Sequence, residues 1–120
     1  MDNKPIALVV EDNPGLAEIF GTALESAGYH TLIMNDGQDA IDWLGQSTPH
    51  LIALDLHLPS ISGDLILGYI RQKAHLNDVK IISISADTRL SDSLRSSLDY
   101  VMNKPVSFAE LRDVAAAFLP

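Results

Sequence analysis

Cysteine is absent from this chain of 120 residues, and basic residues are few. Without cysteine the chain has neither a disulfide bond nor a thiolate ligand for a metal ion. Its 8 lysine and arginine residues stand against 16 aspartate and glutamate residues, and the net charge is −8. Such a chain offers no basic patch for nucleic acid phosphates or an anionic membrane surface, so we expect neither as a direct partner.

Long hydrophobic runs are also missing. No segment approaches the roughly 20 apolar residues that span a membrane. The first residues, MDNKPIALVVED, lack the long apolar segment of a signal peptide. The length fits one domain, and no linker, low-complexity tract or repeat interrupts it. We therefore expect a single cytoplasmic domain over residues 1–120.

The stretch LIALDLHLP at residues 51–59 is apolar except for one acid, Asp55, and one histidine. Such a run is typical of a strand buried on both faces of a parallel sheet. A lone buried carboxylate is unfavourable unless it is paired, bound to a metal or close to the surface. At the C-terminal end of a strand in an open α/β sheet, a side chain points into the crevice where ligands bind. Asp55 is therefore either a solvated acid or a functional one, and the other strand ends decide between the two.

Strand and helix patterns alternate five times along the chain. Apolar runs predict strands at residues 6–10, 30–34, 51–59, 79–84 and 99–102. Apolar residues at helical spacing predict helices at residues 14–27, 40–44, 65–73, 90–98 and 108–118. Asn13-Pro14 and Ser107 are typical helix starts, whereas Gly21 and Gly68 are expected to allow close packing of their helices. The alternation predicts an α/β fold, a parallel sheet with helices on both faces.

Polar residues follow four of the predicted strands. Glu11 and Asp12 come after the first strand, Asp55 lies in the third, and Ser85 and Lys104 follow the fourth and fifth. Parallel strands all end on one edge of the sheet, so these side chains should meet in a single crevice. Three carboxylates there need cations, and Lys104 together with an oxygen-ligated ion such as Mg²⁺ would supply them. An acceptor carboxylate, a metal, a lysine and a hydroxyl suit phosphoryl transfer.

Four motifs in order give the chain a family resemblance. They are VVEDN at 9–13, LDLHLPSISG at 54–63, ISISA at 82–86 and NKP at 103–105. With these motifs at the strand ends, essentially the whole chain resembles the receiver domain of two-component response regulators, of the chemotaxis-regulator type. The resemblance implies a flavodoxin-like fold with five parallel strands in the order 2-1-3-4-5.

The same resemblance implies roles for the residues of the crevice. Asp55 would be the phosphoacceptor, taking the phosphoryl group from a phosphohistidine of a histidine kinase or phosphotransfer protein. Asp12 and Asp55 would ligate Mg²⁺ directly, together with the backbone carbonyl of His57. Glu11 would act mainly through a metal-bound water, and Lys104 would contact a phosphoryl oxygen.

Further roles follow for the positions around the phosphoryl group. Ser85 would be the switch hydroxyl that bonds this group, and the small Ala86 beside it would leave room for the donor. His57 and Asp87 occupy the two variable positions that tune hydrolysis of the phosphoryl group. The Lys104-Pro105 peptide bond is expected to be cis.

The chain departs from the family pattern in two places. The segment from Ser85 to Lys104 is shorter than usual and lacks the Gly-Ala pair before the last strand, so the fourth helix or its flanking loop should be truncated. The switch aromatic of the family falls on Val101. Its neighbour Tyr100 should face the other side of the sheet, because adjacent strand residues point to opposite faces. These departures concern the coupling of phosphorylation to an output, not the phosphorylation chemistry.

Other functions fit the sequence less well. A phosphatase of the haloacid-dehalogenase type needs a second aspartate two residues after the first, where this chain has His57 after Asp55 and Pro14 after Asp12. A flavodoxin needs a Ser/Thr-rich phosphate loop, where this chain has the acidic EDNPG. A receiver-like interaction module that no longer signals by phosphate stays open. We do not expect an enzyme in the usual sense, although the domain should promote its own phosphorylation and dephosphorylation. We also expect an output partner, which the sequence does not identify.

Overall fold

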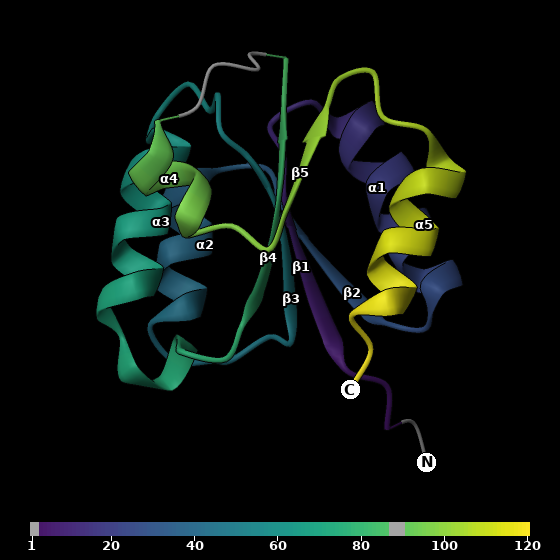
Figure 1. The fold of residues 1–120 in the computed structure, drawn as a ribbon, viewed down its shortest axis with the longest axis horizontal. Helices are drawn as coiled ribbons and strands as arrows, with labels where there is room; N and C mark the ends of the chain where they lie inside the picture. Colours follow the sequence, from purple (N-terminus) through teal and green to yellow (C-terminus); the bar gives the residue numbers. More distant parts are fainter. Residues whose placement is uncertain (1–2, 87–90) are drawn as a thin grey trace.

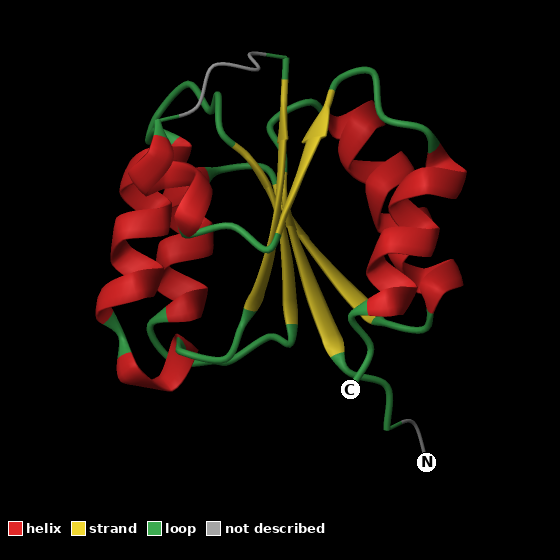
Figure 2. Cartoon of the chain, viewed as in Figure 1, coloured by secondary structure: helices red, strands yellow, loops and turns green. Residues whose placement is uncertain are grey.

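The computed structural model describes residues 3–86 and 91–120 of the chain. In this part, parallel strands form one sheet in the order β2-β1-β3-β4-β5, as predicted (Figures 1 and 2). The strands are β1 (Ile6–Val10), β2 (His30–Met34), β3 (Leu51–Asp55), β4 (Lys80–Ser85) and β5 (Tyr100–Asn103). The helices are α1 (Pro14–Ala27), α2 (Gly37–Leu44), α3 (Gly63–Gln72), α4 (Asp92–Ser96) and α5 (Phe108–Ala117), with a short 3-10 helix η1 (Ala74–Leu76). None of these helices combines the length and hydropathy needed to cross a bilayer.

Each face of the sheet has its own hydrophobic core. Helices α1 and α5 cover one face, and α2, α3 and α4 cover the other (Figure 1). In β1, Ala7 and Val9 pack in the first core, whereas Leu8 and Val10 pack in the second, because side chains alternate along a strand. All residues of the central strand β3 are buried, as its apolar sequence predicts. Fully burying a Val or Leu side chain contributes about 1.5–3 kcal/mol to the stability of the folded state. The two cores therefore hold the strands, and with them the strand ends, in place.

Side chains at the predicted helix starts cap the helices. Asn13 Oδ1 accepts a hydrogen bond from the Leu16 N–H at 3.0 Å, and Pro14 begins α1. Ser107 Oγ accepts a hydrogen bond from the Glu110 N–H at 2.9 Å at the start of α5. These bonds satisfy backbone donors that have no partner within the helix. Both helices therefore begin just beyond the edge of the sheet where the polar residues gather.

The third strand is shorter than predicted, because it ends at Asp55 rather than at Pro59. The His57 N–H donates to the Asp55 side chain, so a local side-chain bond replaces the pairing of strands at this point. The chain then turns, and the Gly63 N–H donates to the Leu56 carbonyl at 3.1 Å. This loop brings the start of α3 back against the end of β3.

Helix α4 is short and spans Asp92–Ser96, so it ends before the predicted Leu98, whereas the predicted start at Leu90 lies outside the described residues. None of its side chains is buried. The Arg71 guanidinium of α3 donates a hydrogen bond to the Ser97 carbonyl and ties the end of α4 to its neighbour. Serine and aspartate favour caps and turns over helix interiors, which explains why the helix does not extend further.

The glycines of the helices differ in the space around them. A Cβ at Gly21 would lie 3.0 Å from Ile33 Cδ1, so this glycine allows close packing, although against β2 rather than a helix. A Cβ at Gly68 would meet no atom within 4 Å, so the packing role predicted for Gly68 is wrong. At Gly63 a Cβ would lie 2.5 Å from the Leu56 Cα, which no side-chain movement can relieve.

Two alanine substitutions in α3 should therefore have opposite effects on stability. Gly63→Ala should lower the free energy of unfolding by about 1–3 kcal/mol, because backbone next to Asp55 must move. Gly68→Ala, the matched control, should raise it by about 0.5–1 kcal/mol, because alanine is favoured inside a helix and the site has room. Urea unfolding followed by circular dichroism measures both. A Gly63→Ala variant as stable as the wild type would contradict the packing described for this loop.

Candidate carboxylate site

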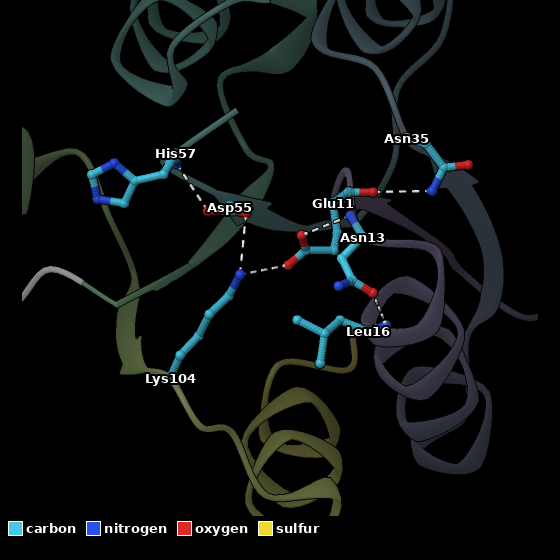
Figure 3. A network of polar contacts seen from close by, with 7 residues as sticks. All are labelled: Glu11, Asn13, Leu16, Asn35, Asp55, His57 and Lys104. Atoms are coloured by element: carbon cyan, nitrogen blue, oxygen red, sulfur yellow. Dashed lines mark hydrogen bonds and ion pairs between the residues drawn. The ribbon is translucent and has the colours of Figure 1, made fainter. Parts of the chain in front are cut away.

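The carboxyl edge of the sheet brings acids and a lysine from three strand ends into contact. Lys104 Nζ lies 3.0 Å from Glu11 Oε1 and 3.3 Å from Asp55 Oδ2 (Figure 3). Glu11 directly follows β1, Asp55 ends β3, and Lys104 directly follows β5. The predicted convergence of these side chains is confirmed.

Glu11 is held in place from several sides. Its side chain is 1% exposed, and Oε2 accepts a hydrogen bond from the Asn13 N–H at 3.2 Å. The Asn35 amide donates to the Glu11 backbone carbonyl at 3.0 Å (Figure 3), and the Glu11 N–H donates to the Met34 carbonyl. Burial raises the pKa of Glu11 above its ordinary value, although the Lys104 ammonium works in the opposite direction. This carboxyl group is therefore fixed in position, and its burial destabilises the charged form through desolvation.

Both oxygens of the Asp55 carboxylate have donors. Oδ1 accepts the His57 N–H at 2.8 Å, and Oδ2 faces Lys104 Nζ. Asp55 is 3% exposed and pairs with Ile84 in the register of β3 and β4, so the central strands set its height in the sheet. The two donors fix the orientation of the carboxylate as well as its position.

Lys104 is positioned by its own backbone. Its N–H donates to the Ser85 carbonyl at 2.9 Å, which continues the pairing of β4 and β5, and the Lys104-Pro105 peptide bond is cis, as predicted. Burial works to lower the pKa of the ammonium group. The hydrogen bond to Glu11 and the negative charges of Asp55 and Glu11 outweigh that effect, and the pKa of Lys104 is raised. The lysine is therefore a permanent cation at this edge.

Four more of the predicted positions lie at or just after the strand ends on this edge, namely Asp12, His57, Ser85 and Ala86. Ser85 is buried at the end of β4, and Ala86 after it is exposed. Asp12 is exposed at the rim, and His57 contributes its backbone N–H while its side chain is exposed. Asp87 lies outside the residues that the structure describes.

The acids of the site could hold a metal ion. One carboxylate oxygen from each of Glu11, Asp12 and Asp55 lies within 4.8 Å of the others. All these donors are oxygens, which suit a hard divalent cation better than a soft one. Lys104 balances only one of three negative charges, so the donor set fits an added cation.

Val101 and Tyr100, the two residues that the sequence analysis considers for the switch position, lie side by side in β5. Val101 pairs with Ser83 and Tyr100 pairs with Ile82 in the parallel register of β4 and β5. Ile82 belongs to the core on the α1 and α5 face, so Tyr100 lies on that face and Val101 on the other. Tyr100 is 40% exposed and faces the opposite side of the sheet from Val101, as the alternation of strand residues predicts.

The support from Asn35 and the packing of Gly63 are features that the sequence analysis missed. Asn35 begins the sequence Asn-Asp-Gly directly after β2, and its position beside Glu11 follows from the pairing of Val10 with Met34. Pairing the predicted first and second strands in parallel, end to end, would have placed Asn35 next to Glu11.

Known proteins are similar to this chain in sequence and in fold. A family model described as the response regulator receiver domain matches residues 7–116. The chain is 31% identical over 118 residues to the probable methanogenesis regulatory protein FilR2 of Methanothrix harundinacea, covering 89% of this chain and 76% of that protein. It is 36% identical to hybrid signal transduction histidine kinase D of Dictyostelium discoideum, over 91% of this chain and 7% of that kinase.

A solved structure with the same fold is the receiver domain of sensor histidine kinase PA1611 from Pseudomonas aeruginosa PAO1. It aligns with a TM-score of 0.84 at 26% identity and covers 96% of this chain and 97% of its own. That structure has a magnesium ion coordinated in its active site cleft.

Glu11→Gln should stabilise the metal-free protein near neutral pH. A carboxyl group with a raised pKa binds its proton more tightly in the folded chain than in the unfolded chain. Its contribution is therefore fully present below the ordinary value of 4.5 and is lost as pH rises through the raised pKa. Glutamine is neutral throughout, so the variant should have a higher urea midpoint than the wild type in EDTA at about pH 7, and this advantage should vanish below about pH 4.

The matched control is Glu18→Gln on the exposed side of α1, which should leave the midpoint unchanged. A Glu11→Gln midpoint below that of the wild type at neutral pH would contradict the desolvation described for this group.

Proposed function

Because the chain belongs to the response regulator receiver domain family of two-component signalling, we propose that it accepts a phosphoryl group on Asp55. The donor is a phosphohistidine of a histidine kinase or of a phosphotransfer protein. The observation that carries this proposal is the Asp55 carboxylate at the carboxyl edge, with Lys104 Nζ at 3.3 Å and two further acids beside it.

In the proposed reaction, one carboxylate oxygen of Asp55 attacks the phosphorus atom. An O–P bond forms while the P–N bond of the phosphohistidine breaks, and its electron pair returns to the imidazole ring. The His57 N–H orients the carboxylate, and Lys104 offers positive charge to an oxygen of the transferred group. Ser85, at the end of the neighbouring strand, is our candidate for the hydroxyl that bonds the phosphoryl group afterwards.

We propose Mg²⁺ as the cation that the acids hold. Asp12, Asp55 and the His57 backbone carbonyl would ligate it directly, and Glu11 would act through a water. When bound, such an ion neutralises the negative charge that gathers around the phosphoryl group. Asp12 is the exposed member of the set, so a metal and its waters can reach the site without opening the core.

The output of the domain is a separate question. Receiver domains interact with histidine kinases and with output domains or proteins. The short α4 and the valine at position 101 favour a second possibility for this chain, an interaction module whose phosphorylation changes the α4 and β5 region little. NMR distinguishes a switching receiver domain from such a module. The amide signals of β5 should shift on phosphorylation only if the conformational change extends from the carboxylate site to this strand.

Incubation with acetyl phosphate and Mg²⁺ should add the mass of one phosphoryl group. Asp55→Asn should abolish the addition, because an amide oxygen is a poor nucleophile. Asp64→Asn, at an exposed acid in the first turn of α3, is the matched control and should react as the wild type does. Intact-protein mass spectrometry reads both. Equal phosphorylation of the Asp55→Asn protein would overturn the assignment.

Magnesium chloride should raise the melting temperature, since a ligand that binds only the folded state stabilises it by about 2.7 kcal/mol at 100 times its dissociation constant. Asp12→Asn should remove most of this rise, and Asp39→Asn, at an exposed acid on α2, should keep it. Differential scanning calorimetry measures the shift. A rise of equal size in the Asp12→Asn protein would show that the ion binds elsewhere.

A further inference from the structure

A groove runs along the outer edge of β2, away from the carboxylate site. It has a volume of about 240 Å³ and lies between α1 and the strand. Its lining residues are Glu18, Gly21, Thr22, Glu25, Thr31 and Ile33. The strand is the last of the sheet on this side, and Ile33 is 42% exposed. An aliphatic side chain half open to solvent thus forms part of a groove with acids at its rim.

The groove is shaped by specific contacts. Gly21 has no side chain, so Ile33 can lie over α1. A Cβ at position 21 would lie 3.0 Å from Ile33 Cδ1. The Thr31 N–H points away from β1 and donates to Glu25 Oε2 at 2.7 Å. This bond blocks simple addition of another strand at Thr31 and fixes the Glu25 carboxylate at the rim, where it can accept further hydrogen bonds.

The elements around the groove carry only negative charge. Helix α1 contains Glu18 and Glu25, and α2, which follows β2 in the chain, contains Asp39 and Asp42. None of α1, β2 and α2 contains a lysine or an arginine. A partner that buries the exposed Ile33 here must therefore bring positive charge.

We propose that this groove, defined by the six lining residues above, binds an extended basic segment of a partner protein. Glu18 and Glu25 are seven residues apart on α1, which separates them by about 10 Å along the helix. An extended segment with basic residues at its first and fifth positions spans about 13 Å, and the long side chains of arginine or lysine absorb the difference. The third residue points to the same side and places an apolar side chain on Ile33.

A peptide of this pattern, acetyl-Arg-Thr-Leu-Thr-Arg-amide, provides the test. Titrated into the ¹⁵N-labelled protein at low salt, it should shift the amide signals of Gly21, Thr31 and Ile33. Glu18→Gln combined with Glu25→Gln should weaken binding at least about fivefold, because two partly exposed ion pairs are lost. The glutamine at position 25 can still accept the Thr31 N–H, so the fold is kept.

Two controls separate this groove from general attraction to an acidic protein. Asp39→Asn combined with Asp42→Asn removes the same charge from α2 and should leave the affinity within about twofold. Replacing the leucine of the peptide by serine should weaken binding as well, because the contact with Ile33 is lost. Equal weakening by the α2 variant, indifference to the leucine, or shifts spread over α2 would each overturn the proposal.

The proposal is independent of phosphorylation at Asp55. The Asp55→Asn protein should bind the peptide as tightly as the wild type, since none of the lining residues belongs to the carboxylate site. If the peptide binds the wild type but not the Asp55→Asn protein, it binds at the carboxylate site, and the groove assignment is wrong.

Discussion

The ammonium group of Lys104 between the buried carboxylates of Glu11 and Asp55 is the interaction on which the rest of the site depends. Three strand ends meet there, and each group alone would be unfavourable so close to the core. The pairing offsets the desolvation only in part, since the pKa of Glu11 remains raised. The sheet therefore holds an excess of negative charge at its carboxyl edge, and that excess is what makes the edge suitable for a cation and a phosphoryl group.

Much of this arrangement could be predicted because it follows from local rules. A buried apolar strand ending in an acid, a helix cap after the first strand and a lysine before proline all leave short-range signals in the sequence. Parallel pairing then brings these strand ends to one edge without any knowledge of side-chain packing. Asp55 and Lys104, 49 residues apart in the chain, meet for this reason.

The features that were missed depend on contacts between distant residues. Gly63 must be glycine because the Leu56 backbone lies against it, and Gly68, in the same helix, faces open space. No local pattern distinguishes the two positions. The third strand was predicted too long because the bond from the His57 N–H to Asp55 ends it before the apolar sequence does. Asn35 supports Glu11 only because β1 and β2 end side by side.

The most direct test of the central claim is to locate the phosphoryl group on the chain. Borohydride reduces an aspartyl phosphate to homoserine, and tandem mass spectrometry of the digested protein identifies the position. After treatment with acetyl phosphate and Mg²⁺, we predict homoserine at position 55 and unchanged aspartate at position 12. Homoserine at position 12, or at an exposed acid with none at position 55, would contradict the account.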